Sequence, residues 1–92
     1  MIFTQRIIIR PKVLMREVAG ESVILDLDTE TYFGLGEVGT RMWQVLTESE
    51  TIQHAYEALL VEYDVTPETL RDDLTKLIED LVDNGLLELT TA

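Results

Sequence analysis

The residues that could do chemistry in this chain are one histidine, many acidic residues and a short run of glycines. His54 stands on a predicted helix, between Gln53 and Ala55 and away from the apolar positions of that helix. A nucleophile needs a partner base, and the chain has no cysteine and no second histidine to complete a pair or triad. We therefore interpret His54 as an ordinary surface residue.

The carboxylates favour a solvated surface over acid–base or metal chemistry. Five of them gather on one predicted helix, outside its apolar stripe: Asp72, Asp73, Glu79, Asp80 and Asp83. Paired acids divide into an acid and a base only when burial separates their pKa values. The run Asp26, Asp28 and Glu30 alternates like oxygen ligands but lacks the glycine and distal glutamate of a calcium loop. We expect no catalytic residue, no metal and no cofactor.

The glycines Gly34, Gly36 and Gly39 match the GxGxxG pattern of dinucleotide sites. That pattern binds a pyrophosphate when it joins a strand to a helix inside a parallel βαβ unit. A chain of 92 residues with antiparallel strands ahead of the motif is too short for a doubly wound sheet. The match is therefore interpreted as coincidental.

The net charge of the chain restricts the classes of molecule that it can bind. Eighteen acidic against seven basic residues give a formal net charge of −11, and such a surface repels nucleic acid, whose binding depends on Lys and Arg. The acidic coat either steers a basic or neutral partner or simply maintains solubility. We predict a single domain over residues 1–92, no membrane span and, since residues 1–12 are too polar for a signal peptide and cysteine is absent, a cytoplasmic protein.

The stretch Ser22–Leu46 organises the predicted fold. It begins as an alternating strand, with Val23, Leu25 and Leu27 on one face and Ile24, Asp26 and Asp28 on the other. A turn over residues 28–31 leads to a short strand, Tyr32–Leu35, and residues Lys12–Ala19 form a preceding strand through a turn at Gly20-Glu21. Residues 7–10 are an edge strand or a lead-in, and residues 1–10 are a loose strand or arm.

Three helices follow the strands. The first spans about residues 37–47 and places Trp43 in the core; the second begins at the N-cap Thr51 and ends near residue 64. Thr66 and Pro67 start the third, and Asn84-Gly85 ends it before an extended tail at residues 86–89. Its apolar stripe is Leu70, Leu74, Leu77, Ile78, Leu81 and Val82. The fold class is α+β, with a three-stranded antiparallel sheet followed by three helices.

An open strand edge is the one functional feature of this arrangement. Tyr32–Leu35 is last in its sheet and runs directly into a helix. Unpaired backbone groups on such an edge invite an added strand, and a groove toward the third helix would accept apolar side chains of an extended peptide. Alternatively, Tyr32 and Phe33 are ordinary core and rim residues.

The run LDLDTETYFGLGEVGTRMWQVL resembles the PqqD-like family. Its residues Leu25-Asp26, Tyr32, Leu35, Gly39, Met42-Trp43 and Leu46 stand at the family's motif positions, and the likeness covers about residues 13–87. One departure is Gly36, where the family usually has an Asn or Ser helix cap. The resemblance implies a winged-helix-like fold and a role as the recognition element for precursor peptides that are made on the ribosome and then modified.

The resemblance also implies how the precursor binds. Its leader would dock as an antiparallel strand along the third strand, in the groove against the third helix. The peptide-binding residues implied are Tyr32, Phe33, Gly34, Leu35, Leu70, Asp73, Leu74, Leu77, Ile78, Asp80 and Leu81. Only some of the leucines are expected to touch peptide, and Asp73 and Asp80 would pair with a basic leader residue.

Within the family, the likeness is greatest to stand-alone leader-binding proteins of lasso-peptide pathways. The partners implied are a precursor leader peptide, a cysteine-protease-like leader peptidase and an ATP-dependent cyclase. A chaperone for the pyrroloquinoline quinone precursor, or for another class of modified peptide, is the alternative.

Two other classes of protein stay open. A winged-helix DNA binder would share the topology, but its third helix would carry only Arg71 and Lys76 against at least five acids. A dimerisation module would use residues 7–9 and the open edge. We predict no enzymatic activity.

Overall fold

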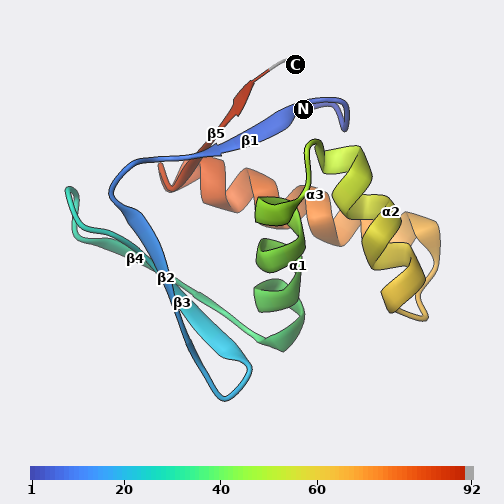
Figure 1. Cartoon of the computed structure of the whole chain (residues 1–92), viewed down its shortest axis with the longest axis horizontal. Helices are drawn as coiled ribbons and strands as arrows, with labels where there is room; N and C mark the ends of the chain where they lie inside the picture. The colour runs from blue at the N-terminus through green and yellow to red at the C-terminus, as the bar shows by residue number, and fades with distance from the viewer. Residues whose placement is uncertain (91–92) are drawn as a thin grey trace.

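The computed structural model describes residues 1–90. Its strands are β1 (Arg6–Ile9), β2 (Val13–Val18), β3 (Glu21–Asp26), β4 (Thr31–Leu35) and β5 (Leu87–Thr90), and its helices are α1 (Glu37–Glu48), α2 (Ile52–Glu62) and α3 (Pro67–Asp83). Strands β2, β3 and β4 form an antiparallel sheet in that order, and the helices follow it in the chain (Figure 1). The predicted α+β class, with three strands followed by three helices, is confirmed.

Residues near the two ends of the described chain form a second, two-stranded sheet. Strand β1 pairs antiparallel with β5, with Ile7 opposite Leu89 and Ile9 opposite Leu87 (Figure 1). The extended tail predicted after α3 is thus confirmed. The residues before β1 are also fixed, because Gln53 N–H donates to the Phe3 carbonyl at 2.7 Å and so occupies a free amide of the α2 N-terminus.

The hairpin between β2 and β3 turns one residue earlier than predicted. Val18 pairs with Glu21, so the two turn residues are Ala19 and Gly20, not Gly20 and Glu21. Both have positive φ, 55° at Ala19 and 85° at Gly20. That combination is the type I′ turn, whose twist matches the flanking strands. The cost falls on Ala19, because a side chain disfavours the left-handed region.

Strand β3 buries its more polar face. Ser22, Ile24 and Asp26 are at most 5% exposed, whereas Val23 is 38% exposed. The buried polar groups have partners: the Ser22 and Thr40 hydroxyls share a hydrogen bond of 2.7 Å, and Asp26 Oδ1 accepts the Asp28 N–H at 2.9 Å. Burial therefore carries little penalty for them, and the apolar alternate positions of β3 face solvent.

The hydrophobic core lies where the three helices meet β3, β4 and β5. Trp43 is 4% exposed, as predicted for a core residue. The start of α3 is also as predicted, because Thr66 Oγ1 accepts the Thr69 N–H at 3.2 Å and Pro67 occupies the first turn. Gly85, at φ 72°, ends that helix. None of the helices in residues 1–90 is long and apolar enough to cross a membrane.

Replacing Ala19 by Asn should stabilise the protein, because Asn tolerates the left-handed conformation that the turn imposes. We expect Ala19→Asn to raise the free energy of unfolding by about 0.5–1 kcal/mol. Thermal unfolding followed by circular dichroism would measure this as a Tm a few degrees higher. The matched control is Ala58→Asn, at an exposed helix position, where the same exchange should lower Tm. A lower Tm for Ala19→Asn would contradict the turn assignment.

Candidate functional site

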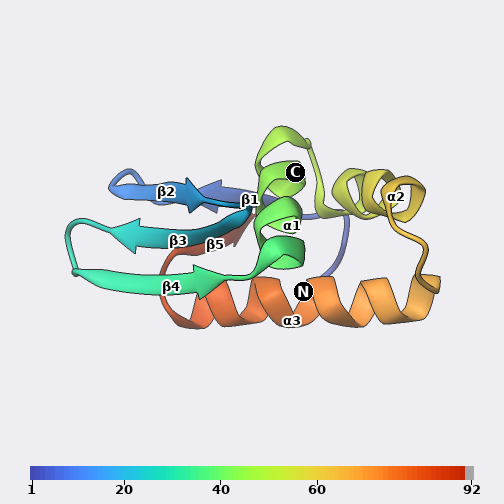
Figure 2. The ribbon, with the colours of Figure 1, turned by 90° about the horizontal axis from the view of Figure 1, so that it is seen from below.

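Strand β4 is an edge of its sheet. It pairs with β3 on one side, with Leu35 opposite Ser22 and Thr31 opposite Asp26. Among residues 1–90 no other strand pairs with its far side. Figure 2 shows that β4 is the strand of this sheet nearest α3. In an antiparallel strand alternate residues direct both N–H and C=O to the same side, so β4 offers a row of backbone donors and acceptors along this edge.

A groove of about 270 Å³ lies beside this edge. Its lining comes from β4, α1 and α3: Phe33, Val38, Gly39, Met42, Asp73, Lys76, Leu77 and Asp80. The side chains of Phe33, Val38, Met42 and Leu77 make its wall apolar, and the charged residues of α3 lie along one rim. We call this space the β4–α3 groove. It is suited to apolar side chains that project from an extended chain lying along β4.

The charged rim of the β4–α3 groove is only loosely held. Lys76 Nζ lies 3.2 Å from Asp80 Oδ2, one helical turn apart, with side chains 78% and 39% exposed. Exposed ion pairs of this kind contribute about 0.3–0.5 kcal/mol. Asp80 can therefore exchange Lys76 for a basic group on a ligand at small cost, and Asp73 stands on the same rim.

The α3 residues predicted to bind peptide fall into two groups in the structure, one in the core and one at the groove. Four of the α3 residues are core, each at most 2% exposed: Leu70, Leu74, Ile78 and Leu81. We remove these four from the proposed contact set, because a peptide cannot reach them. Leu77 is the leucine of α3 that lines the groove, together with Asp73 and Asp80. Leu77 differs from the four core residues because it lies at the edge of the apolar stripe of α3, whereas they lie along its centre.

The four predicted residues of β4 also differ in location: one lines the groove, one is in the core, and two lie on the opposite face of the sheet. Phe33 lines the β4–α3 groove, and Leu35 is 6% exposed and packs in the core. Tyr32, at 72% exposed, and Gly34 lie on the opposite face of the sheet. Their backbone nevertheless belongs to the same strand edge, and strand addition uses backbone groups whichever way the side chains point.

Sequence reasoning missed the contribution of α1 to the groove. Val38, Gly39 and Met42 line it, as does Lys76 of α3. A signal was present, because Val38 and Met42 are spaced as one helical face. Val38 is 50% exposed, whereas Met42 is 3% exposed. The apolar stripe of α1 therefore extends past the core and into the groove.

Arg41, Glu62 and His54 lie outside the lining of the β4–α3 groove and have structural contacts instead. Arg41 Nε lies 2.8 Å from Glu62 Oε2 and joins α1 to α2 at the surface; this hydrogen bond lowers the pKa of Glu62 and raises that of Arg41. His54 is exposed, and its backbone N–H donates to Thr51 Oγ1 at the start of α2. Within residues 1–90 no three His, Cys, Asp or Glu side chains gather as a metal site.

The fold and the groove define a winged-helix-like α+β protein with an open strand edge. The chain belongs to the PqqD family: residues 21–87 match the family model described as coenzyme PQQ synthesis protein D. A search of curated proteins found no match.

Two solved structures have the same fold over most of this chain. TbiB1 in complex with the TbiA(beta) leader peptide is 36% identical, with a TM-score of 0.79 over 87% of this chain and 93% of that one. A lasso peptide synthetase B1 complexed with the leader peptide is 22% identical, with a TM-score of 0.79 over 90% of this chain and 98% of that one. At that lower identity the second comparison shows the fold alone.

Leu74 and Leu77 test the division between core and groove. Leu74 is fully buried and Leu77 is half-buried. We expect Leu74→Ala to lower the free energy of unfolding by about 2–5 kcal/mol and Leu77→Ala by less than about 1.5 kcal/mol, because only the first leaves a cavity in the core. Urea unfolding of the two variants measures the difference. Equal losses would contradict the assignment of Leu77 to the groove.

Proposed function

We propose that this protein binds the leader segment of a ribosomally synthesised precursor peptide as an added strand on β4. The observation that carries the proposal is the open edge of β4 beside the apolar β4–α3 groove. The resemblance in fold to two proteins whose structures contain leader peptides supports it. So does membership of the PqqD family.

The open edge of β4 and the β4–α3 groove have different roles in recognition. Backbone hydrogen bonds to β4 supply affinity with little dependence on peptide sequence, and the groove supplies selectivity through alternate side chains. A volume of about 270 Å³ lined by Phe33, Met42 and Leu77 selects for apolar peptide side chains of leucine or aromatic type. Asp73 and Asp80 on the rim favour a basic residue next to them.

The solved structures with the same fold support one pathway in particular. The assignment that we propose is lasso-peptide biosynthesis: the chain shares its fold with a lasso peptide synthetase B1, and TbiB1, to which it is 36% identical, was likewise solved with a leader peptide. There it acts without catalysis of its own and delivers the precursor to a cysteine-protease-like leader peptidase and then to a cyclase, in the cytoplasm. The family description favours a second candidate, the recognition of the pyrroloquinoline quinone precursor. The two candidates differ in the downstream enzymes and, at this site, in which leader fits the groove.

A titration with fluorescently labelled leader peptides tests the site. We expect one lasso-type leader to bind one-to-one with a micromolar or lower Kd, about −8 kcal/mol or better. Leu77→Glu should weaken binding at least about tenfold, because it places a charge in the apolar groove. The matched control is Val61→Glu, on α2 at a position that is 91% exposed, where affinity should not change.

Fluorescence anisotropy gives the affinities, and circular dichroism checks that both variants fold. A folded wild-type protein that binds neither the lasso-type nor the pyrroloquinoline quinone leader would contradict the proposed function. Equal affinities for Leu77→Glu and Val61→Glu would remove the groove from the site.

Leader peptides with single N-methyl groups test strand addition itself. N-methylation removes one backbone donor without changing the side chain. Because alternate residues of an added strand donate to β4, we expect affinity losses at every second position of the docked segment and small effects between them. Anisotropy titrations with each methylated peptide measure the pattern. Losses with helical spacing, or none at all, would show that the leader docks in another conformation.

A further inference from the structure

Glu30, in the turn between β3 and β4, has a backbone conformation that its residue type disfavours. Its φ is 60°, in the left-handed region, where the Cβ of any residue other than glycine crowds the backbone. Asparagine and aspartate tolerate this region better than glutamate, because their short polar side chains hydrogen-bond locally. Such conformations persist only where the surrounding structure imposes them, and they are concentrated at functional sites.

Hydrogen bonds on either side of Glu30 hold the turn in place. Asp26 Oδ1 accepts the N–H groups of Asp28, at 2.9 Å, and of Thr29, at 3.4 Å. Thr29 Oγ1 donates to Thr31 Oγ1 at 2.8 Å. Because Asp26 is only 4% exposed, these bonds tie the turn to the body of the protein. None of them uses the Glu30 carboxylate, so its charge is not required for the shape of the turn.

The Glu30 carboxylate is the unpaired charge of this turn. Glu30 is exposed, and within residues 1–90 its side chain has no ion pair and no hydrogen bond. The neighbouring Asp28 Oδ1 lies 3.7 Å from Lys12 Nζ, so the charges of those two residues offset each other. The turn therefore presents one negative charge without a partner, at the residue directly before β4.

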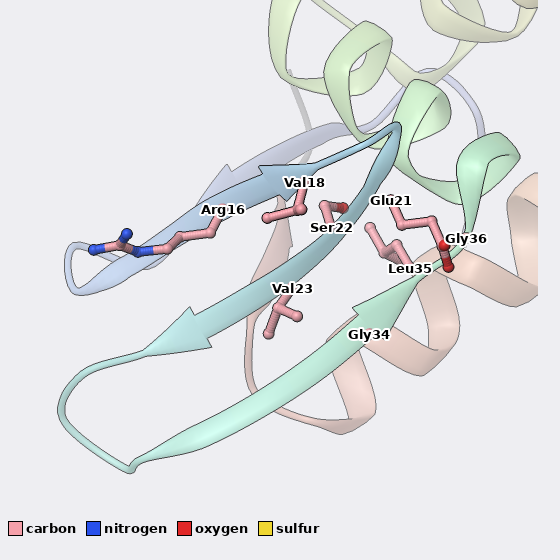
Figure 3. Close-up of a pocket in the computed structure, with 8 residues that line it drawn as sticks. All are labelled: Arg16, Val18, Glu21, Ser22, Val23, Gly34, Leu35 and Gly36. Atoms are coloured by element: carbon pink, nitrogen blue, oxygen red, sulfur yellow. The ribbon is translucent and has the colours of Figure 1, made fainter.

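The charged residues beside the opposite end of β4 are offset by their surroundings. Figure 3 shows Arg16 and Glu21, one charge of each sign, among the residues that line a shallow hollow beside Gly34. Glu37 lies in the first turn of α1, where its charge complements the positive end of the helix dipole. A peptide strand along β4 therefore meets an uncompensated charge at the Glu30 end.

The direction of the added strand decides which part of a leader meets Glu30. Strand β4 runs from Thr31 to Leu35, and the family resemblance implies an antiparallel leader. The upstream part of the leader then lies beside Leu35, and the chain leaves the strand beside Thr31. The first leader residue beyond the paired segment passes Glu30. A basic side chain at that position would gain an exposed ion pair, which changes a Kd by up to about fivefold.

We propose that Glu30 is a specificity-determining residue, which selects leaders that carry a lysine or arginine directly after the segment paired with β4. This inference rests on the proposed function. It adds a charge requirement at the downstream end of the site to the apolar requirement of the β4–α3 groove. The left-handed backbone at position 30 lowers the stability of the turn, and the carboxylate is retained there because it contacts the leader where the leader leaves the strand.

Anisotropy titrations with two synthetic leaders test the assignment. The leaders differ only in a lysine or a glutamate at the position after the paired segment, which the N-methyl series locates. We expect the wild-type protein to prefer the lysine leader by about two- to tenfold at low salt and by less at high salt. Glu30→Gln should abolish the preference and Glu30→Lys should reverse it. A merely structural role for Glu30 would not produce that reversal.

Glu30→Gly and Ala19→Gly are the matched pair for the backbone. Each places glycine at a left-handed turn position, so both should raise Tm, but only Glu30→Gly should lose the preference for lysine. A lower Tm for Glu30→Gly would contradict the conformation on which the inference depends.

The outcomes separate this inference from the proposed function. An unchanged preference in folded Glu30→Gln would overturn the role of Glu30 while leaving leader binding intact. Absence of binding of both leaders by the folded wild-type protein would instead be a failure of the proposed function.

Discussion

The one-sided pairing of β4 is the constraint on which the rest of this structure depends. The chain leaves the sheet at Leu35 and begins α1 at Glu37, and within residues 1–90 it supplies no further strand to this edge. Close packing fixes the junction: a Cβ on Gly39 would lie 3.2 Å from the side chain of Leu35, which is buried. Helix α1 is thereby held against the end of β4, and α3 lies across from the strand. The space bounded by β4, α1 and α3 is the β4–α3 groove.

The two faces of the same sheet differ in burial and in composition. The face toward the core tolerates Ser22 because a hydroxyl of α1 hydrogen-bonds to it, and tolerates Asp26 because two backbone amides of the following turn donate to it. The face turned away from the core carries Leu14, Val23 and Leu25.

Much of the fold was predictable because it depends on local patterns. Period-two and helical periodicities gave the strands and helices, and Thr66, Pro67 and Gly85 fixed the bounds of α3. The buried face of β3 was not predictable, because the partner of Ser22 is Thr40, 18 residues away. The candidate site was half predictable: the edge and α3 were identified, but neither the burial of Leu74 nor the place of Val38 in the groove can be inferred without packing.

Amide hydrogen exchange in β4, measured by NMR with and without leader peptide, tests the central claim most directly. Strand addition predicts that the outward amides of residues 31–35, which no strand within residues 1–90 pairs with, exchange much more slowly in the complex. Their protection should alternate with that of the amides already paired to β3. Tight leader binding with unchanged exchange throughout β4 would contradict the account, because the peptide would then occupy the protein without pairing with its edge.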